Sequence, residues 1–146
     1  MIETRYKNKT RSGVKTFIKR LFIGSIVLMA VLVTSCGAIP GATECNTVVN
    51  SFMQAGAAKD VNAAYDLCVE EMAREDIENL ILGQHQLFAG YQNISIKGIN
   101  IEYKGARSFA EYSGEAKYSD GRTMWVEAEL VKRGDNWELV SIWISP

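Results

Sequence analysis

The sequence predicts an α+β fold in which three short helices precede a bent four-stranded antiparallel sheet. Between Asn46 and Phe88, apolar residues recur at the spacing of amphipathic helices. From Tyr91 onward, apolar residues instead alternate with polar ones, as in strands that bury one face. Because the helical patterns all come before the strand patterns, we expect the helices to pack together on one face of the sheet.

The three helices are delimited by their apolar stripes and by residues that start or end helices. The first should begin at Asn46 and end near Gly56–Ala58. Asp60 should cap the second helix, since its short carboxylate can accept from free backbone N–H groups. The third is predicted from Arg74 to Phe88, with acidic residues in its first turns, where the helix dipole favours them.

The strands can be placed in register from their alternation. The first strand slips phase at Gly98, which predicts a β-bulge. The next two strands, 109–118 and 123–132, should be joined by a three-residue loop, Ser119-Asp120-Gly121. This loop pairs Ala116 with Met124, whereas a two-residue turn would mix the polar and apolar faces.

The last strand is predicted to follow a similar loop at Lys132-Arg133-Gly134. That loop places Val140, Ile142 and Ile144 beside Val126, under the helices. The opposite face of the sheet should then carry the remaining alternate residues: Phe109, Glu111, Ser113, Glu115, Trp125, Glu127, Glu129, Val131, Trp137, Leu139 and Trp143.

The stretch from Leu21 to Cys36 indicates where the protein is delivered. Residues 1–36 contain seven basic residues and one acid, all of them ahead of an uncharged apolar run, which is typical of an export signal. Val33-Thr34-Ser35-Cys36 resembles the lipobox of bacterial lipoproteins. The resemblance implies that Cys36 is acylated, for example by palmitate, and that the preceding peptide is removed. Alternatively, 21–43 is an uncleaved membrane helix. Both interpretations put residues 37–146 on the extracytoplasmic side of the cell membrane, with 37–45 as a tether and 46–146 as the domain.

Charge and cysteine content narrow the function classes. Residues 37–146 hold nine basic and sixteen acidic residues, which argues against binding nucleic acid or anionic lipid. One histidine and no paired cysteine motif argue against a structural metal site, and we expect no cofactor. If the first two helices are antiparallel, Cys45 approaches Cys68, and outside the cytoplasm they should form a disulfide. The other interpretation is that Cys68 is a small buried hydrophobic residue.

A family resemblance covers roughly Asn46 to Ile144. It is carried by Phe52-Met53-Gln54-Ala55-Gly56, by Lys59-Asp60-Val61-Asn62-Ala63-Ala64-Tyr65, and by Trp137-Glu138-Leu139-Val140-Ser141-Ile142. These stretches resemble the nuclear transport factor two-like superfamily, in particular small bacterial lipoproteins with lumazine-binding-like domains of unknown function. The resemblance implies a cone-shaped, cystatin-like fold with an internal cavity and frequent dimerisation through the outer sheet face. The superfamily includes isomerases, dehydratases and non-catalytic members, so the fold alone does not assign an activity.

Catalytic groups are hard to find in this sequence. His85 is the single histidine, and it lies off the apolar stripe of its predicted helix. Asp66 with Tyr65 and Tyr91 could imitate an acid and an oxyanion donor, but we expect Asp66 to face solvent. We therefore expect a non-catalytic binding domain, with a small cavity enzyme of the isomerase or dehydratase type as the alternative.

The predicted outer sheet face is the candidate contact surface. It groups Trp125, Trp137, Leu139 and Trp143 with Glu111, Glu127 and Glu129, and Glu111 should lie directly opposite Glu129. Like charges across strands are destabilising, so Ca²⁺, a basic partner or solvent should compensate them. Exposed aromatic residues favour an interface, either in a homodimer or with an envelope protein, unless the sheet curls and covers them.

Overall fold

The computed structural model describes residues 39–146, and Ala38–Pro146 make up one compact unit. The predicted leader, Cys36 and the first residues of the tether lie outside the described residues. Within 39–146, no helix is both long enough and apolar enough to cross a membrane.

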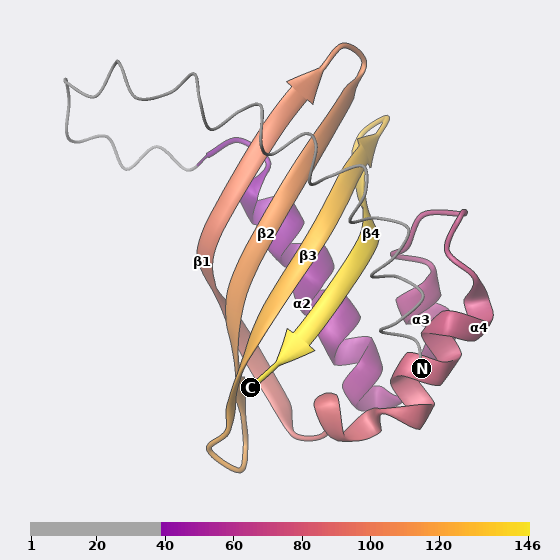
Figure 1. Ribbon diagram of the computed structural model, residues 1–146, viewed down its shortest axis with the longest axis vertical. Coiled ribbons are helices and arrows are strands. Elements are labelled where there is room, and N and C mark those ends of the chain that lie inside the picture. The colour runs from indigo at the N-terminus through magenta and orange to yellow at the C-terminus, as the bar shows by residue number, and fades with distance from the viewer. Residues whose placement is uncertain (1–38) are drawn as a thin grey trace, which may run out of the picture. The chain divides into compact units, whose positions relative to one another are not determined.

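The predicted α+β order is confirmed. Helix α2 lies across one face of the sheet, behind the four strands in Figure 1. The strands follow one another in the order β1-β2-β3-β4, and every neighbouring pair is antiparallel. The elements are α2 (Ala42–Ala58), α3 (Val61–Tyr65), α4 (Arg74–Glu78), a π-helical turn η1 (Asn79–Gly83), a 3-10 turn η2 (His85–Leu87), β1 (Tyr91–Lys104), β2 (Arg107–Tyr118), β3 (Thr123–Arg133) and β4 (Asn136–Ser145).

Helix α2 starts earlier than predicted. Its first residue is Ala42, so the second half of the expected tether is helical. Gly41 precedes it with a φ of 89°, a left-handed conformation that glycine adopts without strain. The prediction that Asp60 caps the next helix is confirmed, because its carboxylate accepts from the Ala63 N–H at 3.0 Å.

The predicted pairing of β2 with β3 is confirmed. Ala116 pairs with Met124, Tyr112 with Ala128, and Glu111 with Glu129. Gly121 has a φ of 86° in the loop between them, as the three-residue loop requires. The β1–β2 pairing also shifts between Ile96 and Gly98, which confirms a bulge beside Gly98.

The predicted phase of β4 is wrong for its first half. Arg133 pairs with Asn136, so β3 and β4 are joined by a two-residue turn at Gly134-Asp135. Trp137 and Leu139 therefore lie on the helix-covered face and are buried. The register then shifts at Glu129/Leu130, and this irregularity returns Ile142 to the helix-covered face and Trp143 to the opposite one.

The predicted disulfide is not formed, since Cys45 and Cys68 are both buried free cysteines. Unequal helix lengths explain the error. At 1.5 Å per residue, α2 runs about 20 Å from Cys45 to its C-terminus, whereas the five residues of α3 span only about 7.5 Å. The chain after α3 therefore does not return as far as Cys45. Cys68 instead donates its thiol proton to the Ala64 carbonyl, with an S–O distance of 3.3 Å.

The segment after α3 closes part of one sheet edge. Cys68 forms a parallel bridge with Leu139 of β4. The Val69 N–H donates to the Leu139 carbonyl at 2.9 Å, and the Leu139 N–H donates to the Leu67 carbonyl at 2.8 Å. These bonds satisfy backbone groups that an edge strand otherwise leaves open.

Candidate functional site

The sheet face opposite α2, here called the outer face, carries the predicted aromatic and acidic cluster. Trp125 and Phe109 are 37% and 39% exposed, while Trp143 is half-buried. The register places Glu111 opposite Glu129, and Glu127 opposite Trp143. Trp137 and Leu139, which were expected here, belong to the inner face instead.

Two of the three central glutamates are held by neutral donors. The Trp125 Nε1–H donates to Glu127 Oε1 at 3.3 Å. The Ser141 hydroxyl donates to Glu129 Oε2 at 2.9 Å, and Ser141 itself is buried. Within residues 39–146, no lysine, arginine or histidine lies within ion-pair distance of Glu111, Glu127 or Glu129.

Two bases beside this face, Lys97 and Lys104, are engaged by other acids. Lys97 Nζ lies 3.6 Å from a carboxylate oxygen of Glu115. Lys104 Nζ lies 3.1 Å from Glu102. In the described part of the chain, no three acidic, histidine or cysteine side chains are grouped in a way that could hold a metal ion. The carboxylates at the centre of the outer face are therefore left to solvent or to a partner.

The inner face carries two tyrosine–asparagine hydrogen bonds that sequence reasoning missed. The Tyr112 hydroxyl donates to Asn46 Oδ1 at 2.8 Å, and the Tyr91 hydroxyl donates to Asn50 Oδ1 at 2.6 Å. Asn46 and Asn50 are four residues apart and so lie on one face of α2. That spacing, next to the buried Val49, was the available signal in the sequence.

These tyrosines are neutral hydrogen-bond donors. Burial raises the pKa of the Tyr91 and Tyr112 phenols above the ordinary value, and neighbouring groups reinforce the shift. The Tyr118 pKa is also raised, mainly by burial, and its hydroxyl donates to the Leu87 carbonyl at 2.6 Å. These hydrogen bonds join the helical segment to the sheet, and each of the three phenolic O–H groups donates to an acceptor.

The acid–base groups considered from the sequence are not brought together. Asp66 is exposed, and Tyr65 lies under the Arg74 guanidinium at 5.7 Å, while Tyr91 is bonded to Asn50. His85 is half-buried, and its Nδ1 has no hydrogen-bond partner within the described residues. No proton-transfer pair results from these residues.

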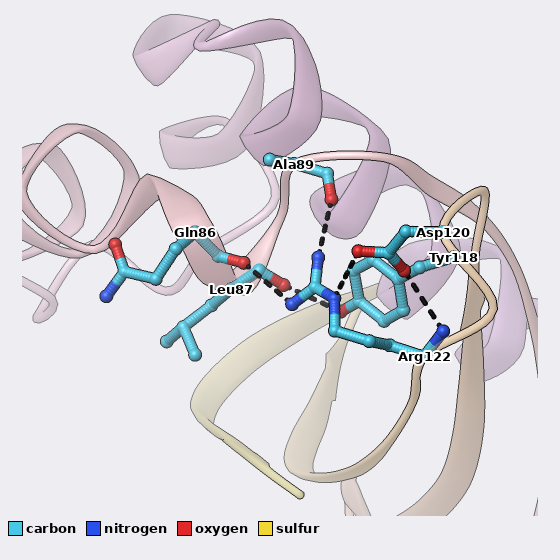
Figure 2. Close-up of polar contacts among 6 residues, drawn as sticks. All are labelled: Gln86, Leu87, Ala89, Tyr118, Asp120 and Arg122. Carbon is cyan, nitrogen blue, oxygen red and sulfur yellow. Dashed lines mark hydrogen bonds and ion pairs between the residues drawn. The ribbon is translucent and has the colours of Figure 1, made fainter.

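Arg122 fastens the β2–β3 loop to the end of the helical segment (Figure 2). Its guanidinium donates to the carbonyls of Gln86 at 3.2 Å and Ala89 at 3.0 Å, and its Nε lies 2.6 Å from Asp120 Oδ2. The same group lies 4.7 Å from the centre of the Tyr118 ring. A cation at the C-terminal end of a helical turn stabilises its free carbonyls, so Arg122 supports the fold at this end of the sheet.

Comparison with known proteins supports the fold and no particular activity. No protein-family model and no curated protein matches the chain. A protein of unknown function with a cystatin-like fold from Nostoc punctiforme is 11% identical, covering 73% of this chain and 91% of its own, with a TM-score of 0.56.

Two further solved structures are similar at a lower level. A nuclear transport factor two-like protein from Novosphingobium aromaticivorans is 15% identical, covering 89% of this chain and 87% of its own, with a TM-score of 0.49. One of unknown function from Pseudomonas putida is 10% identical, covering 74% of this chain and 87% of its own, with a TM-score of 0.48. The similarity to the Nostoc structure assigns the fold: the chain has a cystatin-like fold.

Proposed function

We propose that this protein is an extracytoplasmic lipoprotein, anchored to the membrane through Cys36, whose nuclear transport factor two-like domain binds another protein without catalysing a reaction. The observation that carries the binding role is the outer face, where Trp125 and Phe109 are exposed beside glutamates that have no basic partner within residues 39–146. Exposed aromatic side chains grouped on one face are typical of interaction sites.

The inner face supports a structural role better than a catalytic one. The Tyr91 and Tyr112 hydroxyls are committed to asparagine oxygens, and burial keeps both phenols protonated. General acid–base chemistry favours a group whose pKa lies near the working pH, and the pKa values of these phenols are shifted away from it. An isomerase or dehydratase activity would need a proton acceptor beside these tyrosines, and Asp66 is exposed instead.

The anchoring half of the proposal is tested by the intact mass of the full chain extracted from bacterial membranes. We expect a chain that starts at Cys36 and carries acyl groups, and a Cys36→Ser variant that keeps its leader. A wild-type mass that starts at Met1, without acyl groups, would contradict the lipoprotein assignment.

The binding half is tested by photo-crosslinking in intact membranes. A photoreactive phenylalanine derivative at Ser113 would sit on the outer face, since Ser113 pairs directly with Glu127. We expect it to capture a protein partner, whereas the same residue at Gln54, which is exposed on α2, should not. Equal capture at both positions, or none at either, would reject the outer face as a binding surface.

A further inference from the structure

Three glutamates lie close together at the centre of the outer face. Glu111 and Glu129 lie directly opposite each other on β2 and β3, and Glu127 lies two residues from Glu129 along β3. Like charges at such positions repel one another. Within residues 39–146, the side-chain donors to Glu127 and Glu129 are the neutral groups of Trp125 and Ser141. A surface that retains this repulsion is complementary to a positively charged one.

On the basis of the binding role proposed above, we propose that the outer face binds a basic polypeptide segment of another protein. Lysine or arginine side chains of that segment pair with Glu111, Glu127 and Glu129. The same charges keep the face from pairing with a second copy of this chain.

The geometry around Glu127 suits an arginine anchor. The Trp125 indole N–H holds the Glu127 carboxylate at 3.3 Å, and Trp143 lies directly across the strand pair from Glu127. A guanidinium can stack on an indole ring while it donates to a neighbouring carboxylate, and an ammonium does both less well. Trp125 is sufficiently exposed to offer its ring to such a group.

Self-association through this face is opposed by the same residues. A two-fold symmetric contact sets the same patch of both copies together, so a contact centred on Glu111 and Glu129 brings glutamates against glutamates. Of the bases on or beside this face, Lys97 and Lys104 are paired with Glu115 and Glu102. The other two, Arg107 and Lys117, lie at the two ends of β2, four and six residues from Glu111 and away from the centre of such a contact. Burying carboxylates without a counter-charge is costly, so a basic partner competes well against a second copy.

The rest of the exported chain favours the same partner at longer range. Residues 37–146 carry sixteen acidic and nine basic residues. A net negative domain attracts a basic segment before contact and raises the association rate, and salt weakens this effect. Binding should therefore be salt-sensitive as well as dependent on the three glutamates.

A defined probe tests the charge requirement. The full chain, extracted in a non-ionic detergent, is titrated with an oligoarginine peptide while fluorescence anisotropy of the labelled peptide is followed. Replacing Glu111, Glu127 and Glu129 together with glutamine should weaken binding by about tenfold or more, which corresponds to about 1.4 kcal/mol, because close charge pairs at an interface contribute at least that much. The control replaces three exposed glutamates outside the outer face, Glu70, Glu75 and Glu78, with glutamine and should change binding much less. Equal weakening in the two triple variants, or none in either, would overturn the proposal.

The crosslinking experiment separates this inference from the proposed function. If a partner is captured at Ser113, and capture is lost in both Trp125→Ala and the outer-face triple glutamine variant, the basic-partner proposal is supported. Loss in Trp125→Ala alone would keep the binding role and overturn the basic partner. Capture of a second copy of this chain would overturn the proposal as well. Sedimentation adds an independent readout, since the triple glutamine variant should self-associate more strongly than the wild type.

Discussion

The two faces of the sheet are built from alternate residues of the same strands and have opposite properties. On β3, Val126, Ala128 and Leu130 are buried under the helices, while Trp125 and Glu127, which alternate with them, are exposed. Polar side chains on the inner face hydrogen-bond within the protein, as Tyr91 does to Asn50. The outer face leaves carboxylates and aromatic rings available. Stability should therefore depend mainly on the inner-face positions, and the binding role proposed above on the outer-face ones.

The largest expected difference between the faces concerns two phenylalanines. Phe88 is fully buried against Phe52, whereas Phe109 is 39% exposed on the outer face. Phe88→Ala should lower the free energy of unfolding by about 3–5 kcal/mol through lost burial and the cavity left behind. Phe109→Ala should change it by roughly 0.5 kcal/mol or less. Urea unfolding followed by circular dichroism measures both, and similar losses would show that the outer face is also packed.

A second comparison uses two helical glycines. A Cβ on Gly56 would lie 2.3 Å from a ring carbon of Phe88, so the buried ring would have to move. Gly56→Ala should therefore destabilise the protein by about 1–3 kcal/mol. A Cβ on Gly83 would meet no other atom within 4 Å, and Gly83→Ala should be neutral or slightly stabilising. Urea unfolding of the two variants measures the difference, and a loss at position 83 equal to that at 56 would argue against tight packing between α2 and Phe88.

The Arg122 contacts should matter less, because the group is partly exposed. Arg122→Ala removes donors to Gln86 and Ala89 and should lower the free energy of unfolding by about 1 kcal/mol. Hydrogen exchange should accelerate at residues 85–90 before it does so in β3. Arg122→Lys keeps the charge but cannot reach two carbonyls and a carboxylate together, so it should restore only part of the loss. Full recovery with lysine would mean that charge alone holds the loop.

The ionisation of the two buried thiols, Cys45 and Cys68, should have the smallest effect on stability near neutral pH. Burial raises the pKa of Cys45 and Cys68 to about 12, so both should resist thiol reagents until the protein unfolds. Because the folded pKa lies above the ordinary 9.0, their stabilising contribution is complete below pH 9.0 and is lost as the pH rises from there towards 12. Mass spectrometry after labelling of native and urea-unfolded protein measures the difference. Rapid labelling of the native protein would mean that the inner face opens readily.

The parts predicted correctly are those in which local pattern and tertiary packing agree. Strict alternation in β2 and β3 leaves one register that buries a single apolar face, and the pairing of Glu111 with Glu129 follows from it. The Gly98 slip was visible for the same reason. The outer face could therefore be outlined from the sequence, including the exposure of Trp125.

The features that were predicted wrongly or missed are those that no local sequence pattern determines. In β4 the apolar alternation changes from odd-numbered positions (Trp137, Leu139) to even-numbered ones (Ile142, Ile144), and the register shift lies at this change. Unlike the bulge in β1, no glycine occurs there to indicate it. The Cys45–Cys68 disulfide failed because it required two helices of similar length, and α3 ends at Tyr65. The Asn46–Tyr112 bond joins residues far apart in the chain, which periodicity does not pair.

The bridge between Cys68 and Leu139 has a consequence for association of the sheet with other copies of the chain. A sheet with two open edges can be extended by one neighbour after another, which leads to fibres. Here a foreign strand cannot run the length of β4, because the Leu139 backbone groups are already taken by Leu67 and Val69. Strand addition at the β1 edge would therefore stop after a single partner, which allows many copies to be held at high local density without polymerising edge to edge.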